Sequence, residues 1–304
     1  MFYEQEYQQY LRSSGRLAST RQIHRYTLKR LIAFLASRGI TEAKAVMTVH
    51  VEEFTRELIK RGYAVKTIGN ELMRVRIYFG FLERQKTIFL SPTAGLRIPR
   101  SHSGHHRSYT DNELCERLEK LDVSTALGLR ARAILELAYS AALRPREIRA
   151  LKLSDVEHAK GVLFIEQSKN RKDRIIPVGR TALDWVDRYV VEVRNIHRGE
   201  VDHDRVFVSH KTGKPLSARG LSWALEEACR QAAIEPIELY SMRASAATNL
   251  LEAGMGVVHI SRLLGHESIR TTQVYLHTRE RELARIVRAN HPRFRSSSRE
   301  GVSA

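Results

Sequence analysis

Apolar residues recur at helical spacing through the first third of the chain. From Ile68 to Leu82 they advance by four, three, four and three positions, which places one apolar stripe along one face of a helix. Shorter patterns predict two earlier helices, over residues 20–38 and 48–60, and a glycine follows each of them. We expect Thr20 to cap the first of these helices. Together the three segments predict a helical N-terminal domain over residues 1–95.

The apolar periodicity stops between residues 91 and 108. This stretch contains two prolines, two glycines and four serines, a composition that predicts a linker, which we assign to residues 96–108. A second domain, residues 109–290, opens with Thr110 and Glu113 in a capping-box pattern ahead of an apolar run. Residues 291–304 are polar and predict a tail without a packed core.

The second domain combines helical patterns with a short β segment. A strongly apolar helix is expected over residues 126–141, and β-branched runs at 161–165 and 174–178, joined by a polar tip, predict a β-hairpin. Further helices are predicted near residues 180–195, 217–233, 241–253, 256–264 and 268–278, with a short strand at 205–209. The expected fold class is therefore mainly α with a small β-sheet (α+β).

The charge of the chain indicates a polyanionic partner. Its 51 lysines and arginines exceed 34 aspartates and glutamates, which gives a formal net charge of +17. The first 100 residues hold 18 basic against 8 acidic side chains. Nucleic acid explains such an excess better than an anionic membrane does. On the helix that carries the apolar stripe, Lys66, Arg74 and Arg76 are the expected phosphate contacts.

Several features favour a cytoplasmic, nucleoid-associated protein. No window approaches the ~20 apolar residues that a membrane helix needs, and residues 1–10 lack the apolar core of a signal peptide. Cys115 and Cys229 lie inside helical patterns without C-x-x-C spacing. We interpret both as buried thiols in a reducing compartment, and neither as part of a disulfide or a metal site.

The chemically most informative stretch lies near the C-terminus. His266 follows Leu263-Leu264-Gly265 and precedes Tyr275 by nine residues. A tyrosine acts as a nucleophile only if its proton is removed and an electrophile is held in line with it. Three earlier segments supply cations that can hold an anionic electrophile: the turn with Arg144, the basic hairpin tip at 168–174, and the helix start with Arg243.

Taken in order, the segments ALRPREI, SKNRKDRIIP, YSMR, LLGH and TTQVY resemble the signature of the tyrosine recombinase (phage integrase) family, in particular its compact Xer-like members. The resemblance covers about residues 10–290, and the N-terminal part rests mainly on helical pattern and charge. It implies a helical core-binding domain of SAM-like type and a catalytic domain that clamp duplex DNA. It also implies cutting and rejoining of DNA through a 3′-phosphotyrosine intermediate, with no metal and no other cofactor.

The resemblance also implies a role for each motif residue. Tyr275 is the expected nucleophile on a phosphodiester, and His266 the expected hydrogen-bond partner of the scissile phosphate. Arg144 and Arg243 are the candidates that stabilise the negative charge of the pentavalent transition state. Arginine suits this task because its planar fork binds phosphate bidentately and stays charged.

The general acid is expected on the hairpin, where a lysine can protonate the leaving 5′ hydroxyl. Lys169 is the candidate when the positions are counted back from the R-x-x-P end of the hairpin. Lys172 is its rival, because this tip is one residue longer than in familiar Xer-like proteins. We also expect Arg171 and Lys172 to contact DNA from the tip.

One position departs from the family pattern. The first residue of the usual H-x-x-R motif is Tyr240 here. In the family, that histidine contacts the phosphate and is often assigned a role in accepting the proton of the nucleophile. A tyrosine hydroxyl can donate a hydrogen bond to phosphate, but with an ordinary pKa near ~10 it is a poor base. We therefore expect an active enzyme in which Tyr240 contacts the phosphate.

The resemblance implies double-stranded DNA with specific recombination sites as the partner, and a homotetramer assembled on two such sites. An apolar stripe at Leu283, Ile286 and Val287 is a candidate for docking between subunits. No arm-binding domain is expected ahead of the first helices, and a second recombinase or an accessory protein remains an open requirement. The outcome, whether integration, excision or resolution, is equally open.

Two other functions remain open from the sequence. A type IB topoisomerase-like enzyme would use the same nucleophile chemistry to relax supercoils as a monomer. The other alternative is a sequence-specific DNA-binding protein with a weakened catalytic site. Tyr240, at the usual histidine position, is the feature that favours it.

Overall fold

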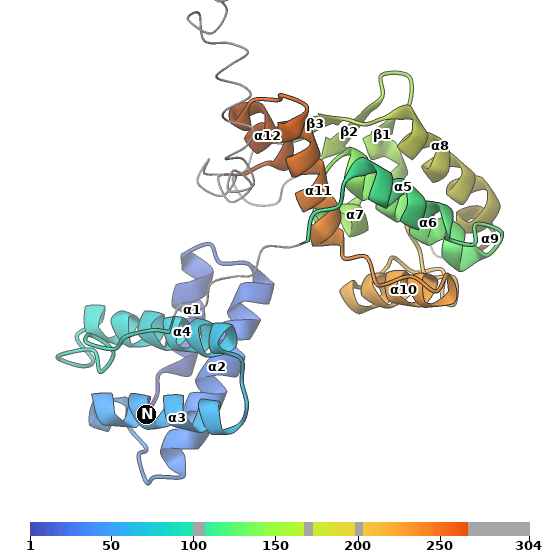
Figure 1. The fold of residues 1–304 in the computed structure, drawn as a ribbon. Helices are drawn as coiled ribbons and strands as arrows, with labels where there is room; N and C mark the ends of the chain where they lie inside the picture. Colours follow the sequence, from blue (N-terminus) through green and yellow to red (C-terminus); the bar gives the residue numbers. More distant parts are fainter. Residues whose placement is uncertain (100–106, 167–172, 198–202, 267–304) are drawn as a thin grey trace, which may run out of the picture. The chain divides into compact units, whose positions relative to one another are not determined.

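A computed structural model describes residues 1–99, 107–166, 173–197 and 203–266 (Figure 1). The chain divides into two compact units, Met1–Gly104 and His105–Ala304, and each is described by itself.

The first unit is helical, as its apolar spacing predicts. Its elements are α1 (Glu4–Ser13), α2 (Ala18–Ala36), a 3₁₀ turn η1 (Ala43–Ala45), α3 (Thr48–Lys60) and α4 (Val65–Arg84). The predicted stripe of α4 is confirmed, since Leu72, Val75 and Phe79 are fully buried. The start of α2 was predicted wrongly: Leu17 is its N-cap, so Thr20 lies inside the helix. The predicted helix over residues 48–60 is confirmed by α3.

Residues 91–99 pack onto α4. Ser91 and Thr93 are buried, and Arg76 donates hydrogen bonds to the carbonyl oxygens of Thr93 and Leu96. A Cβ at Gly69 of α4 would come within 2.5 Å of the carbonyl oxygen of Pro99. The absence of a side chain at Gly69 therefore lets this segment lie close against α4.

The second unit contains the remaining elements. They are α5 (Asp111–Glu119), α6 (Ala126–Ser140), α7 (Pro145–Ala150), η2 (Leu153–Asp155), β1 (Val156–Glu157), β2 (Val162–Ile165), β3 (Arg174–Pro177), α8 (Arg180–Tyr189), a π-helical segment η3 (Val190–Arg194), α9 (Asn195–His197), α10 (Ala218–Gln231), α11 (Leu239–Glu252) and α12 (Val257–Leu264). The apolar helix α6 lies at the centre of the core and packs against α8, α10 and α11.

The capping box that opens this unit is confirmed. The Thr110 hydroxyl accepts a hydrogen bond from the backbone N–H of Glu113 at 3.3 Å. The Glu113 carboxylate accepts one from the backbone N–H of Thr110 at 2.8 Å. These two bonds satisfy donors that would otherwise be unpaired at the start of α5.

The predicted hairpin is confirmed as β2 and β3, which pair in antiparallel fashion with Leu163 opposite Ile176 and Ile165 opposite Arg174. The sheet has a third strand, β1, on the other side of β2. The strand expected at residues 205–209 is reduced to two isolated bridges, at Arg205 and Val208.

The predicted burial of both cysteines is wrong for one of them, since Cys229 is buried but Cys115 is exposed.

Candidate active site

Three of the predicted catalytic residues come together in the second unit. Arg144 is the N-cap of α7, Arg243 lies in the second turn of α11, and His266 follows the C-terminal glycine of α12. Both arginines contact the turn at the end of α12: Arg243 donates to the carbonyl oxygen of Leu264 at 2.6 Å, and Arg144 to that of Gly265 at 2.7 Å. The last carbonyls of a helix carry partial negative charge, so they attract guanidinium groups.

Local backbone conformation makes these contacts possible. Gly265 has φ 60° and ψ 48°, the left-handed conformation that glycine adopts at low cost, and it turns the chain so that His266 follows directly. Ala142 also has a positive φ, 49°, and its carbonyl oxygen accepts a hydrogen bond of 2.6 Å from Arg243. A strained non-glycine residue at the end of α6 therefore presents an acceptor to the buried arginine.

Arg243 is almost fully buried, with 3% of its surface exposed. The small neighbours Ala244, Ser245, Ala246 and Ala247 are buried on the same helix, which lets α11 approach the rest of the core closely. Burial of a charge is costly unless hydrogen bonds compensate it. The carbonyls of Ala142 and Leu264 and the ring of His266 supply that compensation, and they fix the orientation of the guanidinium.

Arg144 is more accessible, and a carboxylate orients it. Its side chain is 24% exposed, and its Nη1 donates to Oε1 of Glu147 at 2.9 Å. The backbone N–H of Arg144 donates to Oε2 of the same carboxylate at 2.8 Å. Burial works to raise the pKa of Glu147, but hydrogen bonds and charge from Arg174 and Arg144 outweigh it and leave that pKa below its ordinary value. Glu147 is therefore an anion that holds Arg144 at two points.

His266 is held as a neutral imidazole. Its Nε2 lies 3.0 Å from Nη2 of Arg243, which can only donate, so Nε2 is the acceptor and the ring proton is on Nδ1. Burial, followed by the positive charges of Arg243, Arg144 and Arg174, lowers the pKa of His266 from 6.5 to about 4. At neutral pH the site therefore contains a neutral hydrogen-bond donor beside two fixed cations.

Tyr240 lies one turn before Arg243 on α11, with half of its surface exposed. It lines a hollow of about 410 Å³ together with Pro145, Arg146 and Arg149. Both arginines line the hollow, and the Nε of Arg149 donates to the carbonyl oxygen of Leu216. Tyr240 is thus accessible to a ligand in this hollow, whose lining does not include Arg144, Arg243 or His266.

The remaining predicted residues of the catalytic unit, Lys169, Arg171, Lys172 and Tyr275, lie outside the described residues. In the first unit, Lys66 is exposed on α4. Arg74 donates to Glu71 at 3.1 Å and to Thr27 at 3.3 Å. Arg74 and Arg76 therefore both make hydrogen bonds within the first unit. Contact of Lys66, Arg74 and Arg76 with DNA stays a prediction.

Sequence reasoning missed the importance of Arg174. Its Nη2 donates to Oε2 of Glu147 at 2.9 Å, so the same carboxylate that holds Arg144 also holds the first residue of β3. The R-x-x-P end of the hairpin contained the signal, but an arginine at an inward strand position can be recognised only once the register of the sheet is known.

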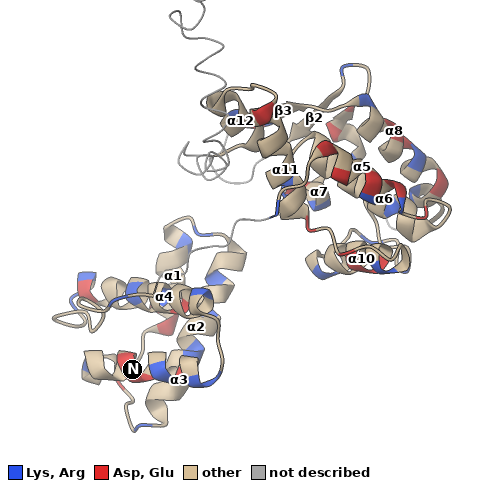
Figure 2. Cartoon of the chain, viewed as in Figure 1, with Lys and Arg blue, Asp and Glu red and all other residues tan. Residues whose placement is uncertain are grey.

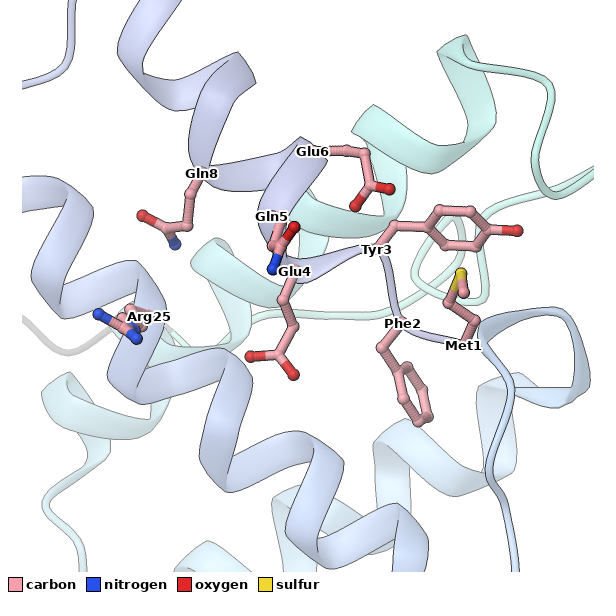
Figure 3. A pocket seen from close by; sticks show the side chains of 8 residues that line it. All are labelled: Met1, Phe2, Tyr3, Glu4, Gln5, Glu6, Gln8 and Arg25. Carbon is pink, nitrogen blue, oxygen red and sulfur yellow. The ribbon is translucent and has the colours of Figure 1, made fainter.

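A second hollow, of about 750 Å³, lies on the first unit and is lined by Met1, Phe2, Tyr3, Glu4, Gln5, Glu6, Gln8 and Arg25 (Figure 3). Glu4 and Glu6 contribute two carboxylates to it, so it does not suit a phosphate. Lysine and arginine residues occur instead along the helices of both units (Figure 2).

Among the described residues, no group of three histidine, cysteine, aspartate or glutamate side chains is arranged to hold a metal ion. Within the same residues, no helix is both long and apolar enough to span a bilayer.

Comparison with known proteins matches both units to one family. Residues 109–282 match the phage integrase family, and residues 5–86 match the N-terminal SAM-like domain of phage integrases. The tyrosine recombinase XerC 2 of Ralstonia nicotianae is 32% identical over 287 residues, which cover 92% of this chain and 82% of that protein. The tyrosine recombinase XerD of Listeria monocytogenes is 29% identical, covering 92% and 94% of the two chains.

The fold has a counterpart among solved structures. The site-specific recombinase XerH, bound to its palindromic difH substrate in a post-cleavage complex, superposes with a TM-score of 0.69 at 19% identity, over 88% of this chain and 79% of that one.

Proposed function

Given that the chain belongs to the phage integrase family of tyrosine recombinases, which exchange DNA strands, we propose that Arg144, Arg243 and His266 hold the scissile phosphate while Tyr275 attacks it. The attack forms a 3′-phosphotyrosine bond and releases a 5′ hydroxyl. In the second half of the reaction, a 5′ hydroxyl from the partner strand attacks that bond and frees the tyrosine. The number of phosphodiester bonds is conserved, so no external energy source is needed.

The observation that supports this proposal most is the pair of arginines fixed on the turn at the end of α12. Arg243 and Arg144 are oriented by carbonyls of the protein itself, those of Leu264 and Gly265. Cations that are already in place stabilise the charge that develops in the transition state without a reorganisation cost at that moment. The same turn leads toward Tyr275, nine residues after His266.

The two arginines differ in the task that their surroundings allow. Arg243 is buried, with bonds to two carbonyls and an imidazole, so it supplies a fixed positive field behind the phosphate. Arg144 is partly exposed, with one Nη bound to Glu147 and the other to Gly265. Since a guanidinium carries five N–H donors, Arg144 retains further donors for phosphate oxygens.

Because His266 is neutral, it can donate a hydrogen bond to a phosphate oxygen without adding a third charge to the site. We propose Tyr240, which is half exposed on the same helix as Arg243, as a second donor to the phosphate. Protonation of the leaving 5′ oxygen belongs to the hairpin lysine, Lys169 or its rival Lys172, since neither arginine gives up a proton at neutral pH.

The assembly that we propose is a homotetramer on two copies of a specific DNA site, carrying out integration, excision or resolution of a mobile DNA element in the cytoplasm, at the nucleoid. Support comes from the family and from the excess of basic residues over both units (Figure 2). The stripe at Leu283, Ile286 and Val287 is the proposed docking element between neighbours. A second recombinase or an accessory protein is a further proposed partner.

Sequencing of recombined DNA tests this function. Purified protein is incubated with a plasmid library that carries fragments of candidate element ends, and new junctions are sequenced. We expect junctions at fixed positions within matching sites, with no base gained or lost. Relaxation of any supercoiled plasmid irrespective of sequence would favour the topoisomerase-like activity, and salt-sensitive binding without junctions would favour a DNA-binding protein.

A further inference from the structure

Arg174 occupies a position at which the strand pattern predicts an apolar side chain. In β3, Arg174 and Ile176 point to the same face of the sheet, and Ile176 is fully buried there. Ile175, which points the other way, is 62% exposed. The charged residue is therefore inside and its apolar neighbour is outside. Such a reversal of local pattern is expected where a residue serves the function of a site.

The contacts of Arg174 lead directly to the catalytic candidates. Its side chain is 11% exposed, as is that of Glu147, and the two form an ion pair of 2.9 Å between Nη2 and Oε2. The other oxygen of this carboxylate receives Nη1 of Arg144. One buried carboxylate thus joins two guanidiniums, one on the hairpin and one at the start of α7.

Burial of Arg174 is only partly compensated. Its Nε and Nη1 are buried and have no hydrogen-bond partner among the residues that the structure describes. Unpaired buried donors are costly, and an apolar residue of similar size would often be as stable or more stable in such a place. Stability therefore does not explain the arginine, and its low exposure argues against direct contact with DNA.

The charges of the cluster suggest what Arg174 does. Arg144, Arg174 and Arg243 contribute three positive charges, Glu147 contributes one negative charge, and His266 is neutral. If Glu147 faced Arg144 alone, the carboxylate would be free to close on that guanidinium and cancel its charge. With Arg174 on its second oxygen, Glu147 is held between two cations, so Arg144 keeps both a fixed orientation and a net positive field toward a ligand.

We propose that Arg174 is a positioning residue for the recombination reaction, which acts through Glu147 to orient Arg144 and to maintain its positive field at the scissile phosphate. This rests on the proposed function of Arg144. Arg174 itself does not touch the reacting atoms, and its effect falls on the rate of the chemical step, not on the affinity for DNA.

The test compares Arg174→Met, which keeps the length of the side chain without its charge, with Arg174→Lys, which keeps the charge. Arg180→Met is the matched control, because Arg180 lies in the same unit with its side chain 81% exposed. Single-turnover formation of the protein–DNA adduct is measured at saturating DNA, and the dissociation constant is measured separately at fixed salt. Thermal melting establishes that each variant is folded.

We expect Arg174→Met to slow adduct formation by about 10- to 100-fold. The dissociation constant should stay within about twofold of wild type, because a side chain that is 11% exposed offers little surface to backbone phosphates. Arg174→Lys should recover most of the rate, and Arg180→Met should match wild type. A wild-type rate in Arg174→Met would overturn the proposal, as would a loss of affinity that accounts for the whole defect.

A modified substrate separates Arg174 from the hairpin lysine. With sulfur in place of the leaving 5′ oxygen, a thiolate departs without a general acid, so a variant that lacks the general acid regains its rate. Arg174→Met should remain slow on this substrate, since its defect is in the field around the phosphate. Full recovery would show that Arg174 serves the leaving group, contrary to the proposal.

The ring of His266 gives a measurement that a loss of folding alone does not imitate. Arg144, Arg174 and Arg243 face this imidazole as cations, so removal of Arg174 should raise the pKa of His266 toward its ordinary value, as followed by NMR. An unchanged His266 titration together with a slow rate would point to a local packing defect and count against the proposal.

If Arg174→Met does not fold, the double variant Glu147→Gln with Arg174→Met removes both buried charges and takes its place. The double variant is compared with Glu147→Gln alone: equal rates agree with the proposal, because Arg174 then has no carboxylate through which to act, and a further loss of rate in the double variant contradicts it. If the wild-type protein itself forms no adduct, the proposed function is wrong. That outcome is distinct from a failure of the Arg174 proposal, which requires an active wild-type protein and an unaffected variant.

Discussion

The sequence predicted the type and the order of the residues in the site, but not the groups that surround and orient them. The sequence predicted Arg144, Arg243 and His266 as one set, and the structure brings them together around the turn at the end of α12. The acceptors that orient them are backbone carbonyls, including that of Ala142, and carbonyls leave no trace in side-chain motifs. The bridge from Glu147 to Arg174 joins side chains of two segments that are separate in the sequence, so it becomes visible only after folding.

Substitution of Tyr240 tests how the proton of the nucleophile is accepted. Because it stands where the family has a histidine and is half exposed, Tyr240→His should fold normally and place an imidazole beside the phosphate. We expect its single-turnover cleavage rate to equal the wild-type rate or to exceed it by up to about 10-fold, since a histidine is a better base than a tyrosine. Tyr26→His, at an exposed position of the first unit, is the control. Complete loss of cleavage would refute the assignment of Tyr240 as a phosphate contact.

His266 makes folding stability depend on pH in a defined direction. Its pKa is about 4 in the folded protein and near 6.5 in the unfolded chain. Between these values the unfolded chain binds a proton that the folded protein does not, so the free energy of unfolding falls as the pH drops from 6.5 toward 4.

Urea unfolding at several pH values measures this contribution. His266→Gln keeps a neutral polar side chain that does not titrate, so its stability should fall less than that of wild type between pH 6.5 and 4. Identical pH profiles of the two proteins would contradict the buried, neutral state of His266.

Elements were predicted well where their apolar pattern is long. The stripe of α4 spans several turns, and the capping box of α5 depends on two residues three positions apart. Helix α1 was missed because its buried residues are just Tyr7 and Leu11. Strand β1 has two residues and is defined by its pairing with β2, which is a long-range property. The π-helical segment η3 contains Arg194, which binds the carbonyls of His203 and Arg205, again a contact beyond local sequence.

The turn after α12 is the element on which the site depends most. Gly265→Ala forces a side chain into the left-handed conformation, at about 1–2 kcal/mol, and displaces the carbonyls that hold both arginines. We expect cleavage to fall by at least about 10-fold, more than the loss of stability explains. Gly39→Ala, with φ 75° and open space around it, provides the control for strain alone. Equal cleavage rates in the two variants would show that catalysis does not depend on the conformation of this turn.

At the scale of the whole molecule, the excess of basic residues was accessible from the sequence. The structure divides into two compact units with separate hydrophobic cores. The assembly on DNA that we propose would involve residues 280–304, which lie outside the described residues. A protein shortened to residues 1–279 lacks the stripe at Leu283, Ile286 and Val287, and should bind a single site with affinity close to that of the full chain. We expect it to lose strand exchange and the tetrameric complex, as measured by recombination and by light scattering. Full activity of a monomeric shortened protein would exclude this stripe as the docking element.

The most direct measurement is the identification of the residue that becomes attached to DNA. The protein is incubated with nicked DNA that contains an element end, denatured and digested, and the DNA-linked peptide is sequenced by mass spectrometry. We predict a 3′-phosphate bond to Tyr275, absent in Tyr275→Phe and present in Tyr240→Phe. An adduct on Tyr240 or on another residue, or none on DNA that the protein recombines, would contradict the account.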